Sequence, residues 1–380
     1  MNKTDKQFIY LDNSATTPLY PEVLDAMLPY LTASYGNPSS LYPLGRKAHA
    51  AIEHTRSIIA SLINASPEEI YFTSGATESN NWVFYMNADK KCLCTAIEHA
   101  SVINQPNIFT FNVTQEGFVD TSMLDYTLMD NPFELVSTML ANNEIGSIQD
   151  IQTIGEICHK HNVKYHVDAT QGLCYLPIDV KKSHIDYLSA SAHKIHGPKG
   201  VGFLYINKDE NKDISSDITP LMYGGGQEQG LRPGTENVAG IVGFGKAIEV
   251  MMQRREDDLQ KLTKLRNYMH YQIMNTIDDV EINGTYDFDR RLPGNLNYCF
   301  ADIKSDELVE MLSEKGIYCS TGSACHNGSG KPSHVLKAIG LTDKQAMSSV
   351  RFSLGPDLDK TDIDVVVQTV INCVYTLRKY

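Results

Sequence analysis

Residues 185–206 read IDYLSASAHKIHGPKGVGFLYI, and their pattern gives the clearest indication of the architecture. Apolar runs at 185–190 and 201–206 have the length and composition of buried strands. Between them lies a polar segment that carries Lys194 and contains Gly and Pro, which let a backbone bend around a ligand. We therefore predict two strands of one sheet, with a lysine just beyond the end of the first.

Upstream of this stretch the chain alternates between strand-like and helical patterns. Further β-rich runs occur at 70–73, 93–97, 135–140 and 163–167. Helical patterns cover 46–63, 151–161 and 238–276, of which the last is long enough to bridge two domains. This alternation predicts an α/β domain with a largely parallel central sheet.

The pattern changes after the long helix. Strand-like runs are expected at 293–300, 317–320 and 350–354, and helices at 305–315, 334–339 and 362–378. These elements predict a smaller α+β domain. We expect a large domain over 13–253 and a small C-terminal domain over 254–380, with segment 1–12 packed against the small domain.

The composition excludes several classes of protein. The chain has 380 residues, of which 42% are hydrophobic and 21% charged, as in an ordinary globular protein. A net charge of −13 opposes non-specific binding to nucleic acid. The start lacks the layout of a signal peptide, and no apolar run reaches the roughly 20 residues that span a bilayer. Eight scattered cysteines lack the paired spacing of a disulfide framework or a zinc site. We therefore expect a cytoplasmic protein with reduced thiols, no metal and no membrane partner.

Candidate functional residues collect just after the predicted strands. In open parallel sheets, ligands bind beyond the carboxyl ends of the strands. Five strands are followed there by phosphate-binding, acidic, amide or basic residues: Gly75-Ala76-Thr77, His99, Asn143, Asp168 with Gln171, and Ser191-Ala192-His193-Lys194. This grouping predicts a ligand site at that edge of the sheet.

Three of these positions point to specific chemistry. Gly75 opens a helix whose N–H groups suit a phosphate, although in isolation a plain helix cap is the better explanation. Asp168 ends an apolar run, where a carboxylate can hold a pyridinium nitrogen protonated, or can simply cap a turn. A partly desolvated Lys194 would have the lowered pKa that imine chemistry needs, whereas most lysines, such as Lys199, stay at the surface.

Motifs along nearly the whole chain resemble one enzyme family. They are Tyr10 to Pro18, Gly36 to Ser40, Gly75 to Asn81, Ala141 to Gly146, His166 to Gln171, Ser191 to Gly200, Gly224 to Gln227, Gly234-Thr235 and Arg351 to Ser353. In this order they resemble the cysteine desulfurases of the class V aminotransferase family. The resemblance implies the fold type I architecture of enzymes that use pyridoxal 5'-phosphate (PLP).

The resemblance also implies roles for the residues that match its motifs. Lys194 binds PLP covalently through its amine, and the phosphate or its surroundings are contacted by Ala76, Thr77, Ser191 and His193. Asp168 faces the ring nitrogen, and Gln171 bonds the phenolic oxygen. Thr235 reaches the phosphate of a neighbouring subunit, which implies a homodimer.

Three further residues are expected to face the substrate. His99 stacks on the cofactor ring and assists proton transfer, Asn143 lies beside cofactor and substrate, and Arg351 grips the substrate carboxylate. A lone histidine more often has a structural role, but the position of His99 after a strand favours a catalytic one.

Cys325 is the predicted nucleophile that receives sulfur from L-cysteine as a persulfide. It lies in a stretch of small, turn-forming residues, where exposure suits a reactive thiolate. Cys319 follows a short strand and is interpreted as packed. His326, next to the nucleophile, either lowers its pKa as a cation or is merely solvated, and the sequence leaves both open.

Parts of the sequence also fit other functions. Gly240 to Lys246 matches a phosphate-binding loop, but Ala247 replaces the Mg²⁺-binding Ser/Thr and no strand precedes it. An aminotransferase or a selenocysteine lyase would share Lys194, although aminotransferase chemistry gives Cys325 no role. A non-enzymatic sulfur-relay platform would lack the colour of bound PLP. The expected partners are a second copy of the chain and a sulfur acceptor, either an iron–sulfur scaffold or a tRNA-thiolation enzyme.

Overall fold

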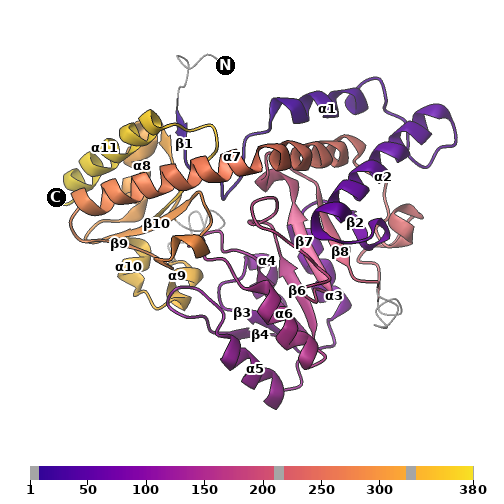
Figure 1. Cartoon of the computed structure of the whole chain (residues 1–380), viewed down its shortest axis with the longest axis horizontal. Coiled ribbons are helices and arrows are strands. Elements are labelled where there is room, and N and C mark those ends of the chain that lie inside the picture. Colours follow the sequence, from indigo (N-terminus) through magenta and orange to yellow (C-terminus); the bar gives the residue numbers. More distant parts are fainter. Residues whose placement is uncertain (1–7, 209–217, 322–330, 380) are drawn as a thin grey trace.

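A seven-stranded sheet forms the centre of the larger part of the molecule (Figure 1). The computed structural model describes residues 8–208, 218–321 and 331–379. The strands, in the order β2-β8-β7-β6-β5-β3-β4, are β2 (Ile70–Thr73), β8 (Gly202–Ile206), β7 (Tyr187–Ser191), β6 (Lys164–Asp168), β5 (Leu135–Met139), β3 (Cys92–Thr95) and β4 (Ile108–Phe111). The α/β prediction is confirmed.

The sheet is mostly parallel, with one exception. Strand β8 runs antiparallel to both β2 and β7, while the other neighbours are parallel. Only residues 192–201 join β7 to β8, which is too short for a parallel crossover of a dozen or more residues. Strand β4 was not predicted, because as an edge strand it is half-exposed and lacks a buried apolar run.

Helices cover the sheet. They are α1 (Pro21–Leu31), α2 (Pro43–Ile63), α3 (Ala76–Met86), α4 (Ala100–Ile103), α5 (Thr121–Asp130), α6 (Ile151–Lys160) and α7 (Val238–Thr276). Short 3-10 helices lie at Pro67–Glu69, Ala192–Lys194, Gln227–Gly230 and Phe288–Arg290. The aspartates at residues 120 and 150 cap α5 and α6 by accepting backbone N–H bonds in the first turn.

Helix α7 has the bounds that the sequence predicted and crosses between the two parts of the molecule (Figure 1). Small residues let neighbouring helices approach it closely. A Cβ at Gly243 would lie 2.7 Å from Met27 Sδ on α1, and one at Gly245 would lie 2.7 Å from Thr55 Oγ1 on α2. The segment that mimics a phosphate-binding loop is therefore a packed helix interior.

The C-terminal part holds two smaller sheets. An antiparallel sheet has the order β12-β10-β9, and β1 pairs with β11 in parallel. The bounds are β1 (Ile9–Tyr10), β9 (Val280–Ile282), β10 (Asn295–Phe300), β11 (Ile317–Tyr318), β12 (Ser349–Ser353), α8 (Ser305–Glu314), α9 (His334–Ala338), α10 (Asp343–Met347) and α11 (Lys360–Leu377). The first described residues thus join the sheets of the C-terminal part.

Two main clusters of buried apolar residues form the cores of the larger part and of the C-terminal part. One contains buried residues from Val23 to Met251, and the other contains Leu11 together with buried residues from Leu262 to Val374. We propose the domain boundary between residues 253 and 254 on this basis. In the described parts of the chain, no helix is both long and apolar enough to cross a membrane.

Candidate active site

A cavity of about 590 Å³ opens at the carboxyl ends of the central strands. This volume is within the range of small-molecule and cofactor sites. Its wall includes the predicted residues Ala76, Thr77, His99, Asn143, Asp168, Gln171, Ser191, His193, Lys194 and Arg351. The parallel strands explain this convergence, because their carboxyl ends meet at one edge of the sheet.

The N-terminus of α3 forms one end of the cavity. Its N-cap residue, Gly75, has φ 153° and no side chain to occupy the first-turn N–H groups. Gly202 on β8 permits the close approach, because a Cβ there would lie 2.7 Å from the Cα of Gly75. Unsatisfied N–H groups and the helix dipole make this end suitable for a phosphate.

His193 lies beside this helix end as an uncharged ring. Its Nδ1 is 3.1 Å from Thr16 Oγ1. Burial, together with the positive charges of Lys194 and Lys199, lowers the pKa of His193 to about 4. At neutral pH this ring therefore contributes hydrogen bonds rather than charge.

Asp168 is the buried carboxylate of the cavity, at the end of β6. Its Oδ1 accepts from the backbone N–H of Thr170 at 3.0 Å, and its Oδ2 accepts from Asn80 Nδ2 at 2.9 Å. Asn80 also donates to Ser101 Oγ at 2.9 Å, and Ser101 Oγ is 2.8 Å from His99 Nδ1. A polar chain therefore joins the carboxylate to the histidine.

Asn80 and Ser101 were not predicted. Asn80 lies one helical turn after Ala76, so it shares the face of α3 that points to the site. The backbone N–H of Ser101 also donates to His99 Nδ1, at 3.2 Å. Because Nδ1 accepts, the neutral ring of His99 carries its proton on Nε2.

Glu98 is a second, fully buried acid in the cavity wall. Its carboxyl accepts from the Thr95 hydroxyl and, at 3.0 Å, from the backbone N–H of Met139. Burial, and then the charge of Asp168, raise the pKa of Glu98 to about 8. At neutral pH Glu98 therefore keeps its proton.

The segment from Ser14 to Thr17 supports Lys194. The Nζ atom of Lys194 donates to the carbonyl oxygens of Ser14 at 2.5 Å and Ala15 at 2.7 Å. Gln171 Nε2 donates to the same Ser14 oxygen at 2.9 Å. The amine is thus held at the cavity wall by backbone carbonyls.

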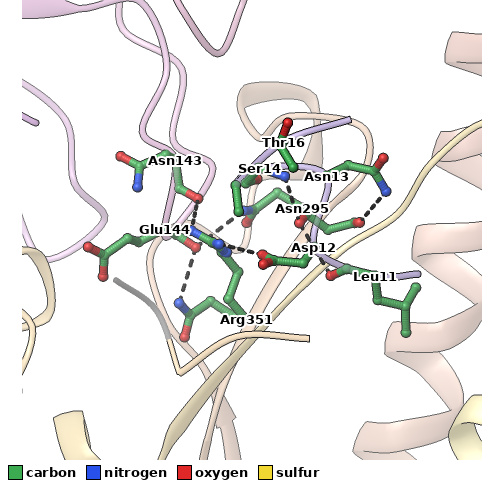
Figure 2. Close-up of polar contacts among 12 residues, drawn as sticks. Leu11, Asp12, Asn13, Ser14, Thr16, Asn143, Glu144, Asn295 and Arg351 are labelled. Atoms are coloured by element: carbon green, nitrogen blue, oxygen red, sulfur yellow. Dashed lines mark hydrogen bonds and ion pairs between the residues drawn. The ribbon is translucent and has the colours of Figure 1, made fainter. Parts of the chain in front are cut away.

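Arg351, on β12, is another part of the cavity wall and is almost completely buried. Its Nη2 donates to Asp12 Oδ1 at 2.6 Å, and its Nη1 donates to the carbonyl oxygen of Asn143 at 3.1 Å. Figure 2 shows the guanidinium between these two partners. Asn142 fixes the turn by accepting the backbone N–H groups of Glu144 and Ile145.

The predicted nucleophile, Cys325, lies outside the described residues. Described residues on both sides of that segment contact the cavity wall. Ser320 exchanges two backbone hydrogen bonds with Arg351, at 3.2 and 2.7 Å. On the other side, Ser333 Oγ donates to Glu144 Oε2 at 2.6 Å, and His334 Nε2 lies 2.9 Å from the carbonyl oxygen of Glu98.

Two other predicted positions lie apart from the cavity. Burial raises the pKa of the Cys319 thiol far above its ordinary value, so this cysteine is a poor nucleophile. Thr235 is exposed and is not among the described residues that line the cavity of its own chain. His334, which does line it, was not predicted, because the sequence pattern assigns it only to a helix start.

The donor set fits PLP. A helix N-terminus suits its phosphate, the buried carboxylate of Asp168 suits its ring nitrogen, and the amine of Lys194 suits its aldehyde carbon. The fold and the site together define a PLP-dependent enzyme of fold type I.

Comparisons with known proteins identify the family. The model of the class V aminotransferases matches residues 9–366. Cysteine desulfurase IscS of Clostridium botulinum is 43% identical over 385 residues, covering 98% of this chain and 95% of that protein. A solved NifS-like protein superimposes with a TM-score of 0.88 at 34% identity and covers 97% of this chain and 100% of its own. A structure of SspA in complex with cysteine gives 0.78 at 35% identity, with coverage of 92% and 99%. The chain belongs to the class V aminotransferase family, and within it to the cysteine desulfurases.

Proposed function

We propose that the protein is a PLP-dependent cysteine desulfurase, which converts L-cysteine to L-alanine and passes the sulfur to Cys325. One observation carries this proposal: Lys194, Asp168 and Arg351 line a single cavity, in a chain that is 43% identical to a cysteine desulfurase. The lysine and the carboxylate suit the cofactor, and the arginine suits the carboxylate of an amino acid.

The residues of one edge of the sheet would hold the cofactor. The amine of Lys194 would attach it, and the first turn of α3, with Ser191 and His193, would bind its phosphate. Bound PLP supplies an electron sink that takes up electron density from the substrate's Cα. Asp168 would keep the ring nitrogen protonated, since its buried carboxylate is held in place by Asn80 and by the backbone N–H of Thr170.

Other residues of the cavity wall would orient the substrate. Arg351, which lines the cavity, would bind the α-carboxylate, and Asn143 would border the same space. His99 would hold and move a proton at Nε2, because its Nδ1 already accepts from Ser101. Proton transfer would thus take place on the side of the cavity that carries His99.

Cys325 would take the sulfur. Its thiolate attacks the sulfur of the bound cysteine, the Cβ–S bond breaks as an S–S bond forms, and Cβ gains a proton as alanine leaves. The net change, cysteine and thiol to alanine and persulfide, balances without an added oxidant. Cys319, which is half-buried, does not suit this role, because desolvation raises the pKa of its thiol well above its ordinary value.

The assembly and the partners are further parts of the proposal. Exposed Thr235 would contact the phosphate in a second copy of the chain, which gives a homodimer with shared sites. The persulfide would pass to an iron–sulfur scaffold or to a tRNA-thiolation enzyme. A reducing, cytoplasmic setting suits the seven free cysteines of the described residues.

The proposal is tested by measuring the products that form from L-cysteine. Purified protein with PLP, L-cysteine and a thiol reductant should release alanine and sulfide in equal amounts. Lys194→Ala should retain its fold, lose the covalently bound yellow cofactor and release neither product. Release of pyruvate and ammonia instead of alanine would contradict the proposal, as would full activity of Lys194→Ala.

A further inference from the structure

The arginine that faces the substrate already has a carboxylate partner. Arg351 and Asp12 form an ion pair at 2.6 Å, although they lie 339 positions apart in the chain. Arg351 lines the large cavity, whereas Asp12 is not among the described residues that do so. Figure 2 shows the Asp12 carboxylate beside the guanidinium of Arg351.

Backbone contacts fix this arrangement. Strand β12 holds the segment around Asp12 through Ser353, two residues after Arg351. Ser353 donates its N–H to the carbonyl oxygen of Leu11 at 2.7 Å and accepts from the backbone N–H of Asn13 at 3.2 Å. The phenol of Tyr10 also donates to the Asp12 carbonyl at 3.0 Å. The carboxylate is thus part of the framework of the site, unlike a mobile surface ion pair.

Two consequences follow for a ligand in the cavity. Asp12 and the Asn143 carbonyl each occupy one guanidinium nitrogen, so the planar group is held in one orientation. Asp12 also compensates the positive charge. A ligand carboxylate therefore meets a guanidinium that is already paired, and the nearby negative charge weakens its attraction.

We propose that Asp12 is a positioning residue that sets how tightly Arg351 binds the carboxylate of the amino-acid substrate and product. The inference rests on the proposed function, because it assumes that an amino acid occupies the cavity. It explains how a buried arginine can orient cysteine and still release alanine: a compensated arginine gives a shorter residence time for the carboxylate.

The test removes the charge of Asp12 while keeping its hydrogen bond to Arg351. Asp12→Asn keeps an oxygen that can accept from Arg351 Nη2 but removes the charge. We expect calorimetry on the PLP-loaded protein at low salt to show roughly tenfold tighter binding of L-alanine. Ethylamine, which lacks the carboxylate, should bind as it does to the wild type. Asp125→Asn, the loss of an exposed carboxylate on α5, is the matched control and should change neither affinity.

Unchanged or weaker binding of L-alanine by Asp12→Asn, with ethylamine binding intact, would overturn the inference. A second measurement uses only the wild type and so does not depend on the folding of a variant. Because Arg351 is compensated, L-alanine should bind less than roughly a hundredfold more tightly than L-alaninamide. A larger preference would also overturn the inference.

Cysteine turnover, measured in parallel, separates this inference from the proposed function. If the wild type forms alanine from cysteine but Asp12→Asn does not bind L-alanine more tightly, only the role of Asp12 fails. If the wild type forms no alanine and Asp12→Asn still binds it more tightly, the desulfurase proposal fails and the carboxylate-binding site remains.

Discussion

Replacing Glu98 by Gln should change how the stability of the protein depends on pH. Glu98 is fully buried and has a pKa of about 8, against 4.5 for the free side chain. The folded protein therefore keeps a proton that the unfolded chain releases above pH 4.5. The contribution of Glu98 to the free energy of unfolding is fully present below pH 4.5 and is lost as the pH rises to about 8.

The magnitude follows from the difference between these pKa values. The shift is 8 − 4.5 = 3.5 pKa units, and each unit corresponds to about 1.4 kcal/mol, so the upper limit is about 5 kcal/mol. Glutamine has the same shape and does not ionise. The free energy of unfolding of Glu98→Gln minus that of the wild type should therefore be several kcal/mol larger at pH 8 than at pH 5.

Urea unfolding of both proteins at the two pH values measures this change directly. The difference between the two pH values matters, because it cancels any packing effect of the substitution itself. If the gap between variant and wild type is the same at pH 5 and pH 8, Glu98 is ionised in the folded state.

Three further substitutions test other parts of the structure. Asp168→Asn preserves the shape but removes the charge, so alanine formation should fall by roughly a hundredfold or more while the cofactor still binds, as read from product and absorbance assays. Gly155→Ala would place a Cβ 1.8 Å from the Ser183 carbonyl oxygen, so the free energy of unfolding in urea should fall by about 1–3 kcal/mol. Glu228→Gln removes the 2.7 Å ion pair of the buried Arg56 guanidinium but leaves the 3.1 Å ion pair with Glu53, so the same assay should show a loss of about 1.5–3 kcal/mol. Wild-type alanine formation by Asp168→Asn would contradict the role of its charge. A wild-type free energy of unfolding in either of the other two variants would contradict the contact that it tests.

Much of the fold could be predicted because its signals are local. Apolar runs identified the inner strands, and helical periodicity gave α7 its observed bounds. The exceptions have physical causes. The edge strand β4 is half-exposed, and the direction of β8 depends on the length of the turn before it. Neither property is visible in a short apolar pattern.

The site could be predicted only where strand ends bring residues together. Lys194 and Asp168 follow strands, so the parallel arrangement itself places them at one cavity, while their catalytic roles stay predictions. Glu98 and Asp12 were missed for a different reason. Their importance depends on burial and on partners far away in the chain, and no local pattern records either.

Two matched variants identify the thiol that receives the sulfur. Cys325→Ala and Cys319→Ala would be incubated with L-cysteine and a reductant, and alanine and sulfide would be measured. Cys319→Ala should stay active, whereas Cys325→Ala should keep its PLP colour but form neither product. Full activity of Cys325→Ala would contradict the persulfide mechanism and favour a lyase or an aminotransferase.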